Sequence, residues 1–199
     1  RSMTVVMCYV GQGDAVLIQL GTAQLLIDAG PDPELVLACL ERALPWWDRH
    51  LEVVVISHTD ADHIGGMSEV LRRYSVGELW LDPIAKDSAL FLELVLTIQE
   101  QVASGMEVFH PFLGQSLAFT QEARIDVLWP EPPTATQRVP HWIFSGTTSP
   151  NISLTENTLS DTFELFSEQL QSHNNRSIVL LLQYFDISLL LVGDVEEKV

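Results

Sequence analysis

The sequence predicts a single α/β domain, because segments with strand character alternate with segments whose apolar residues recur at helical spacing. The clearest strand is residues 51–56, an apolar and β-branched run, and residues 67–74 behind it have helical spacing and composition. The chain has 199 residues, enough for one domain (residues 1–199) with a substantial core. Its 47% hydrophobic and 19% charged residues exclude a disordered chain.

The first half of the chain opens with short strands and continues with helices that alternate with strands. Glycine turns at residues 11–13 and 21–22 separate the first strands. We expect Trp46 and Trp47, which follow the first amphipathic helix, to cap the core. The strands predicted here are residues 4–10, 16–20, 24–27, 51–56 and 77–81, and the helices are residues 33–44, 67–74 and 88–104.

The second half is predicted to be rich in strands, with one irregular part. Residues 130–161 contain five prolines and many Ser, Thr and Asn residues, which indicates a long irregular insertion beside the cleft. A short helix is predicted at residues 162–170. Gln183 and Asp186 interrupt the most apolar run, residues 177–193, so this run predicts two buried strands and not a membrane span. The strands predicted in this half are residues 106–109, 123–129, 178–183 and 187–192.

The composition limits the partners of this chain. Ten Lys and Arg against 27 Asp and Glu residues give a net charge of −17, which disfavours nonspecific nucleic-acid binding unless bound divalent cations offset it locally. Cys8 and Cys39 are too few for a disulfide framework, and we expect both to be buried free thiols. No signal peptide is visible, and residues 1–3 resemble a cloning remnant at the start.

Four potential metal ligands lie in the turn between the strand at residues 51–56 and the helix at residues 67–74. They are His58, Asp60, Asp62 and His63. Imidazole and carboxylate groups bind zinc, manganese or iron, and a tight turn can direct alternate side chains at two ions about 3.5–4 Å apart. An acidic helix cap is the structural alternative, but a cap does not explain two histidines that flank two carboxylates.

Residues 57–66 resemble the His-x-His-x-Asp-His signature of the metallo-β-lactamase superfamily, with Asp60 in the place of the second histidine. The variant His-x-Asp-x-Asp-His-x-Gly-Gly is similar to the one in the C-terminal domain of ComEC-type competence proteins, the DNA-uptake channel family. A carboxylate is a harder ligand than an imidazole, which shifts the expected metal from zinc alone toward manganese.

Two earlier motifs, residues 10–15 and 26–30, resemble the opening motifs of the ComEC-like domain in order and spacing. In that superfamily the position of Asp28 supports the metal-binding loop from beneath without binding the ion. Tyr9 stands where the family usually has Asp, so this chain has one polar group fewer near the cleft.

The resemblance also implies ligands near the end of the sequence. Gly193-Asp194 resembles the superfamily's Gly-Asp motif, whose carboxylate bridges the two metals. His173 stands four residues before Ser177, where many lactamase-fold enzymes carry a metal-binding histidine. A polar loop histidine is the alternative for His173. The family pattern continues past Val199 to a final histidine, so we expect a C-terminally truncated domain.

Taken together, the motifs imply a four-layer αββα sandwich that lacks its C-terminal closing elements, and metal-dependent hydrolysis with two divalent ions, manganese or zinc. His58, Asp60 and Asp194 would hold one ion, and Asp62, His63 and Asp194 the other. Asp62 would be catalytic and would orient the attacking water or accept its proton. The competence proteins imply a nuclease that acts on single-stranded DNA.

Two alternatives remain open. One is a hydrolase of a small ester or thioester, which the acidic composition suits better than DNA, and the other is a non-catalytic lactamase-like interaction module. The resemblance further implies a membrane channel elsewhere in the same parent protein. This soluble domain would then lie on the extracytoplasmic side of a bacterial membrane, with no transmembrane segment of its own.

Overall fold

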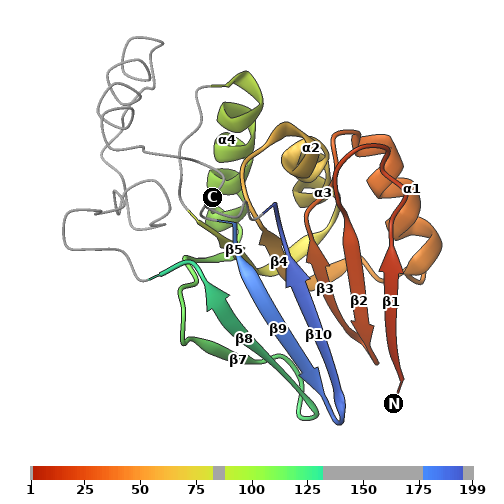
Figure 1. Cartoon of the computed structure of the whole chain (residues 1–199). Coiled ribbons are helices and arrows are strands. Elements are labelled where there is room, and N and C mark those ends of the chain that lie inside the picture. The colour runs from red at the N-terminus through yellow and green to blue at the C-terminus, as the bar shows by residue number, and fades with distance from the viewer. Residues whose placement is uncertain (1, 83–87, 132–176, 195–199) are drawn as a thin grey trace.

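The computed structural model describes residues 2–82, 88–131 and 177–194, which form two stacked β-sheets with helices against the larger one (Figure 1). The larger sheet has six strands in the order β1-β2-β3-β4-β5-β6, and the smaller has four in the order β10-β9-β8-β7. The predicted α/β fold is therefore confirmed. Of the four layers expected, the described residues form three: helices, larger sheet and smaller sheet.

The bounds of the elements follow the predicted ranges closely in most of the chain. The larger sheet contains β1 (Met3–Met7), β2 (Val16–Leu20), β3 (Ala23–Ile27), β4 (His50–Ile56), β5 (Ser75–Leu81) and β6 (Glu107–Phe109). The helices are α1 (Pro33–Ala43), α2 (Ala61–Ile64), α3 (Met67–Arg73) and α4 (Ala89–Ala103). The smaller sheet contains β7 (Ser116–Ala118), β8 (Ala123–Trp129), β9 (Val179–Tyr184) and β10 (Ile187–Val192).

The central strands of the larger sheet are buried on both faces. Val54 of β4 packs in the core beneath the helices, whereas its neighbours Val53 and Val55 pack in the core between the two sheets. A strand segment covered on both faces needs apolar side chains at successive positions, and this explains the unbroken apolar run at residues 53–56 of β4.

Parallel pairing brings two distant loops to the same edge of the larger sheet. Strands β3, β4, β5 and β6 are parallel, and Ile27 at the end of β3 pairs with Val55 near the end of β4. The residues that follow these strands, Asp28 and Ser57, therefore leave the sheet side by side, and the Asp28 N–H donates to the Val55 carbonyl at 2.9 Å.

Some predicted boundaries were wrong. Strand β1 ends at Met7 and not at residue 10, and β5 begins at Ser75, two residues before its predicted start. The short elements α2 and β7 were not predicted, because three or four residues carry no periodic signal. The predicted helix 162–170 and residues 132–161 of the insertion lie outside the described residues.

The expectation of two free thiols was wrong. Cys8, just after β1, and Cys39, on α1, form a disulfide with a Cα–Cα distance of 5.7 Å. The fold places the end of the edge strand against the first helix, which brings two cysteines 31 residues apart in sequence within bonding range.

The expectation that Trp46 and Trp47 cap the core was also wrong. The Asp48 N–H donates to the Pro45 carbonyl, so the two indoles occupy the middle of a tight turn and point outward. They are 79% and 70% exposed and contact one another edge to face, with ring centroids 5.6 Å apart.

Among the described residues, no helix has the length and apolar character needed to cross a membrane.

Two leucines of α4 give a matched test of the core. Leu94 is fully buried in the core that the helices form with the larger sheet, and Leu96 on the same helix is 41% exposed. We expect Leu94→Ala to lower the free energy of unfolding by about 2–5 kcal/mol and Leu96→Ala by less than about 1 kcal/mol, because only the first leaves a cavity. Urea unfolding of both variants measures the difference, and equal losses would contradict the described packing of α4.

Candidate metal centre

The candidate site lies where the ends of the two sheets meet. Asp28 follows β3, residues 57–63 follow β4, and Asp194 follows β10 of the smaller sheet. The Ile178 N–H donates to the Ser57 carbonyl at 2.8 Å, which joins the start of the β9 segment to the end of β4. A Cβ at Gly193 would lie only 2.9 Å from the Ser57 side chain, so glycine lets the chain pass close enough to bring Asp194 over the site.

The Asp28 carboxylate is the buried anchor of the site, at 1% exposed. It accepts hydrogen bonds from the Ser57 N–H at 2.7 Å and the Ser57 hydroxyl at 2.5 Å. It also accepts one from Nδ1 of His63 at 2.8 Å. A buried carboxylate is stable only when its oxygens are satisfied in this way, so the loop after β4 folds around Asp28. This is the supporting position that the resemblance implies for Asp28.

These bonds fix the protonation of both histidine rings. A carboxylate only accepts hydrogen bonds, so His63 carries its proton on Nδ1. The Ser57 hydroxyl gives its one proton to Asp28, so at its 3.0 Å contact with Nδ1 of His58 it must accept, and His58 also carries its proton on Nδ1. In the neutral rings, both Nε2 atoms are left with free lone pairs.

The two Nε2 atoms converge with the Asp194 carboxylate. Oδ2 of Asp194 lies 4.0 Å from Nε2 of His58 and 3.7 Å from Nε2 of His63, and the two rings are 4.0 Å apart between centroids. One ligand atom from each of the three residues lies within 4.8 Å of the others. Nε2 of His58 is buried and has no hydrogen-bond partner among the described residues.

This donor set fits a divalent metal ion. Two imidazole nitrogens and a carboxylate are common zinc ligands, and atoms bound at about 2.0–2.2 Å to one ion are separated by up to about 4 Å. An orphaned buried nitrogen is costly in a folded protein unless something binds it. His58, His63 and Asp194 would hold the ion, with Oδ2 of Asp60 4.0 Å from Nε2 of His58.

The two histidines differ in their electrostatic environment. Burial, with the neighbouring His63 ring, lowers the pKa of His58 and keeps its ring neutral. Burial also lowers the pKa of His63, but the hydrogen bond and negative charge of Asp28 outweigh it, so the net shift of this pKa is upward. The negative charge of Asp28 therefore stabilises positive charge at His63, and it would stabilise a metal cation bound to Nε2 of His63 in the same way.

Comparison with known protein families agrees with this geometry. The family model described as the Metallo-beta-lactamase superfamily matches residues 8–198. The chain belongs to the metallo-β-lactamase superfamily. No curated protein matches the sequence.

Solved structures of the superfamily share the fold at low sequence identity. The metallo-β-lactamase fold protein YhfI from Bacillus subtilis is 15% identical with a TM-score of 0.52, and the match covers 94% of this chain and 59% of YhfI. The MIM-2 metallo-β-lactamase is 15% identical with a TM-score of 0.50, and the match covers 92% and 56% of the two chains. This chain thus spans less than two thirds of either structure.

The predicted site residues of this superfamily member are placed as follows. His58, His63 and Asp194 come together, and Asp60 lies at their edge. Asp60 occupies the N-cap position of α2, yet its side chain makes no cap hydrogen bond, so capping does not explain it. Asp62, in the first turn of α2, is half-buried and outside this cluster, and His173 lies outside the described residues. The assignment of a second ion to Asp62, His63 and Asp194 stays a prediction.

Two structural residues of the site were not singled out from the sequence. Ser57 stands inside the motif, but only the folded network shows that it links Asp28 to His58. Gly13 belongs to the motif of residues 10–15, but only the fold shows its role, since a Cβ on it would lie 1.9 Å from the Asp62 carbonyl oxygen. No pattern along the chain signals a contact between residues this far apart in sequence.

Gly11 and Gly13 offer a matched test of this contact, because both have φ near +85° in the same loop. A Cβ on Gly11 meets nothing within 4 Å, so Gly11→Ala carries only the backbone strain, whereas Gly13→Ala must also displace Asp62. We expect Gly13→Ala to weaken zinc or manganese binding by about 10–100-fold relative to Gly11→Ala. Competition with a chromophoric chelator measures both dissociation constants, and equal values would show that the Gly13 contact does not support the site.

Proposed function

We propose that this chain is a metal-dependent hydrolase whose centre consists of His58, His63 and Asp194, with Asp60 beside them. The observation that carries the proposal is the convergence of two free Nε2 lone pairs, one of them on an orphaned buried nitrogen, upon a carboxylate. A bound divalent ion supplies Lewis acidity there, which polarises the bond to be cleaved and lowers the pKa of water.

The protein residues have separate tasks in this proposal. His58, His63 and Asp194 bind the metal, and Asp28 with Ser57 holds both rings in the required tautomer. Asp62 is the proposed catalytic residue, which orients the attacking water and accepts its proton. Asp62 lies in the first turn of α2, one residue before His63, and its negative charge contributes to the raised pKa of His63, which supports a place near the centre.

A phosphodiester is the substrate class that we favour. Asp60 replaces an imidazole with an oxygen donor, and hard oxygen ligands suit manganese, an ion that also binds phosphoryl oxygens. The same replacement occurs in the motif of ComEC-type competence domains, which supports single-stranded DNA as substrate. We extend this proposal to the setting, a domain of a DNA-uptake channel protein on the extracytoplasmic side of a bacterial membrane.

A second candidate is a hydrolase of a small ester or thioester, favoured by the distribution of positive charge. The basic residues in the described ranges are Arg42, Arg49, Arg72, Arg73 and Arg124. The first four lie at the far ends of α1 and α3 or before β4, away from the metal loop. Within the described residues, the site therefore has no arginine or lysine to neutralise a DNA backbone.

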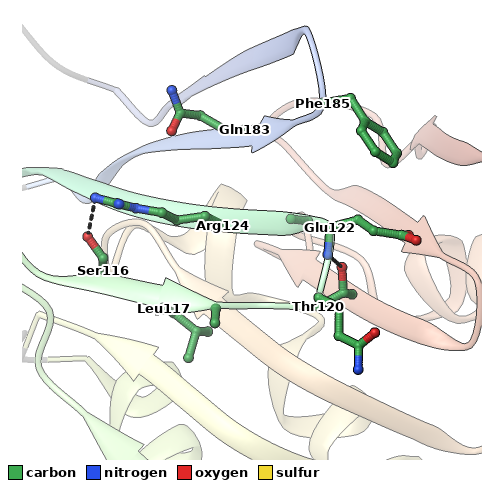
Figure 2. Close-up of a pocket in the computed structure, with 10 residues that line it drawn as sticks. Ser116, Leu117, Thr120, Glu122, Arg124, Gln183 and Phe185 are labelled. Carbon is green, nitrogen blue, oxygen red and sulfur yellow. Dashed lines mark hydrogen bonds between the residues drawn. The ribbon is translucent and has the colours of Figure 1, made fainter.

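Arg124, the fifth of these basic residues, also lies far from the metal loop. It lies near the start of β8, and its side chain extends along the strand toward Ser116 (Figure 2). Its guanidinium donates to Asp126 at 2.6 Å and to Ser116 at 3.0 Å, beside a hollow of about 590 Å³ that also includes Phe185 of the β9–β10 turn. Asp194 follows the opposite end of β10, so Arg124 cannot serve the metal centre.

Hydrolysis of labelled single-stranded DNA, of a chromogenic phosphodiester and of small esters and thioesters tests the proposal on protein loaded with manganese or zinc. We expect Asp62→Ala to lower kcat by about 10²–10⁴-fold while the ion at His58, His63 and Asp194 is retained, because Asp62 is not one of the ligands of that ion. We expect His58→Ala to lose the metal. His50→Ala is the matched control, since His50 is exposed at the far end of β4 and bonds to Ser75.

The substrate panel separates the candidates. DNA cleavage that falls steeply with salt supports the nuclease, whereas turnover of esters or thioesters alone, insensitive to salt, supports the second candidate. Retention of metal without turnover of any substrate would contradict catalysis and leave a non-catalytic module.

A further inference from the structure

The Cys8–Cys39 disulfide joins the outermost strand of the larger sheet to the helix layer. Among the described residues β1 pairs only with β2, so it is an edge strand held on one side. Cys8 follows this strand directly, and its N–H donates to the Ala15 carbonyl at 2.9 Å, which closes the loop of residues 8–15. The disulfide therefore ties the base of this loop to α1.

The loop of residues 8–15 packs against the chain that carries the metal ligands. Gly13 touches the backbone of Asp62 so closely that no side chain would fit. The Asp14 carbonyl accepts a hydrogen bond from the Gly30 N–H at 2.9 Å. Val10 is buried, and a Cβ on Gly30 would lie 2.5 Å from it. The loop thus contacts both α2 and the turn that follows Asp28.

That turn is bonded in its own right to the metal loop. The Ala29 N–H donates to the His63 carbonyl at 2.8 Å, and the Gly66 N–H donates to the Gly30 carbonyl at 3.0 Å. A continuous set of backbone contacts therefore runs from the disulfide through the loop of residues 8–15 to His63. Through these contacts, a displacement of the loop would also displace Asp62 and the neighbouring ligand His63.

We propose that the Cys8–Cys39 disulfide is a redox-controlled clamp on the metal loop. A dithiol reductant transfers two electrons and two protons to the disulfide, which gives two cysteine thiols, while the reductant itself becomes a disulfide. Both cysteines are only partly buried, so a reductant can reach them. Once they separate, the loop of residues 8–15 loses its tie to α1 and the metal centre loses part of its preorganisation.

The disulfide also makes metal binding depend on the redox state of the compartment that holds the protein. Disulfides persist in oxidising compartments and are reduced in the bacterial cytoplasm. The metal centre would therefore reach full affinity only on the oxidising side of a membrane, which agrees with the extracytoplasmic setting proposed above. This inference rests on the metal centre of the proposed function, although not on its substrate.

The test compares the oxidised and reduced forms of the metal-free protein. One sample is treated with oxidised glutathione, the other with dithiothreitol and then iodoacetamide, and both are desalted so that no thiol competes for metal. We expect the reduced, alkylated form to bind zinc about fivefold or more weakly in chelator competition. We also expect faster amide hydrogen exchange in residues 8–15, and unchanged exchange in α4.

A double variant, Cys8→Ser with Cys39→Ser, controls for the effect of alkylation. It should bind zinc as weakly as the reduced protein and show no further response to either treatment. Free thiols that persist after oxidised glutathione would overturn the proposal, and so would equal zinc affinities in the two forms, although the metal centre would then stand. Absence of zinc binding in both forms would overturn the clamp and the proposed function together.

Discussion

The buried carboxylate of Asp28 is the group around which the rest of the site is built. Its burial would be strongly destabilising if its oxygens were unsatisfied, and three donors from Ser57 and His63 satisfy them. The same bonds place the proton of each histidine on Nδ1, through Ser57 for His58 and directly for His63. The hydrogen bonds that satisfy the buried Asp28 carboxylate therefore also leave both Nε2 atoms free to bind a metal ion. The same interactions stabilise the fold and orient the metal ligands.

The position of the site follows from how the two sheets meet. Parallel pairing of β3 with β4 sets Asp28 and Ser57 side by side, and close packing at Gly193 brings Asp194 from the smaller sheet. The loop of residues 8–15, tied to α1 by a disulfide, closes the other side against Asp62. Carboxylates surround the site, and the arginines of the described residues lie at the opposite end of the sheets, so the site attracts cations. A polyanionic substrate would therefore need bound metal ions to offset this negative charge.

Local patterns in the sequence predicted much of this arrangement, and contacts between distant residues accounted for what they missed. The apolar run of β4 and the polar motif after it located the strand, the loop and the ligands His58 and His63, and the resemblance of Gly193-Asp194 to a family motif added Asp194. The resemblance to a known superfamily supplied the supporting place of Asp28. The disulfide, the role of Ser57 and the need for glycine at residue 13 each depend on which segments meet in space. The expectation that Trp46 and Trp47 cap the core was wrong because apolar character alone does not show in which direction the side chains of a turn point.

The most direct measurement of the central claim is the tautomeric state of the two histidines, read from long-range proton–nitrogen NMR spectra of metal-free protein. The spectra should be recorded well above the raised pKa of His63, so that both rings are neutral. Our account predicts a proton on Nδ1 and a bare Nε2 in both His58 and His63, with both Nε2 signals shifting when zinc is added. A proton on Nε2 of either ring, or Nε2 signals that zinc leaves unchanged, would contradict the claim that Asp28 prepares a metal centre.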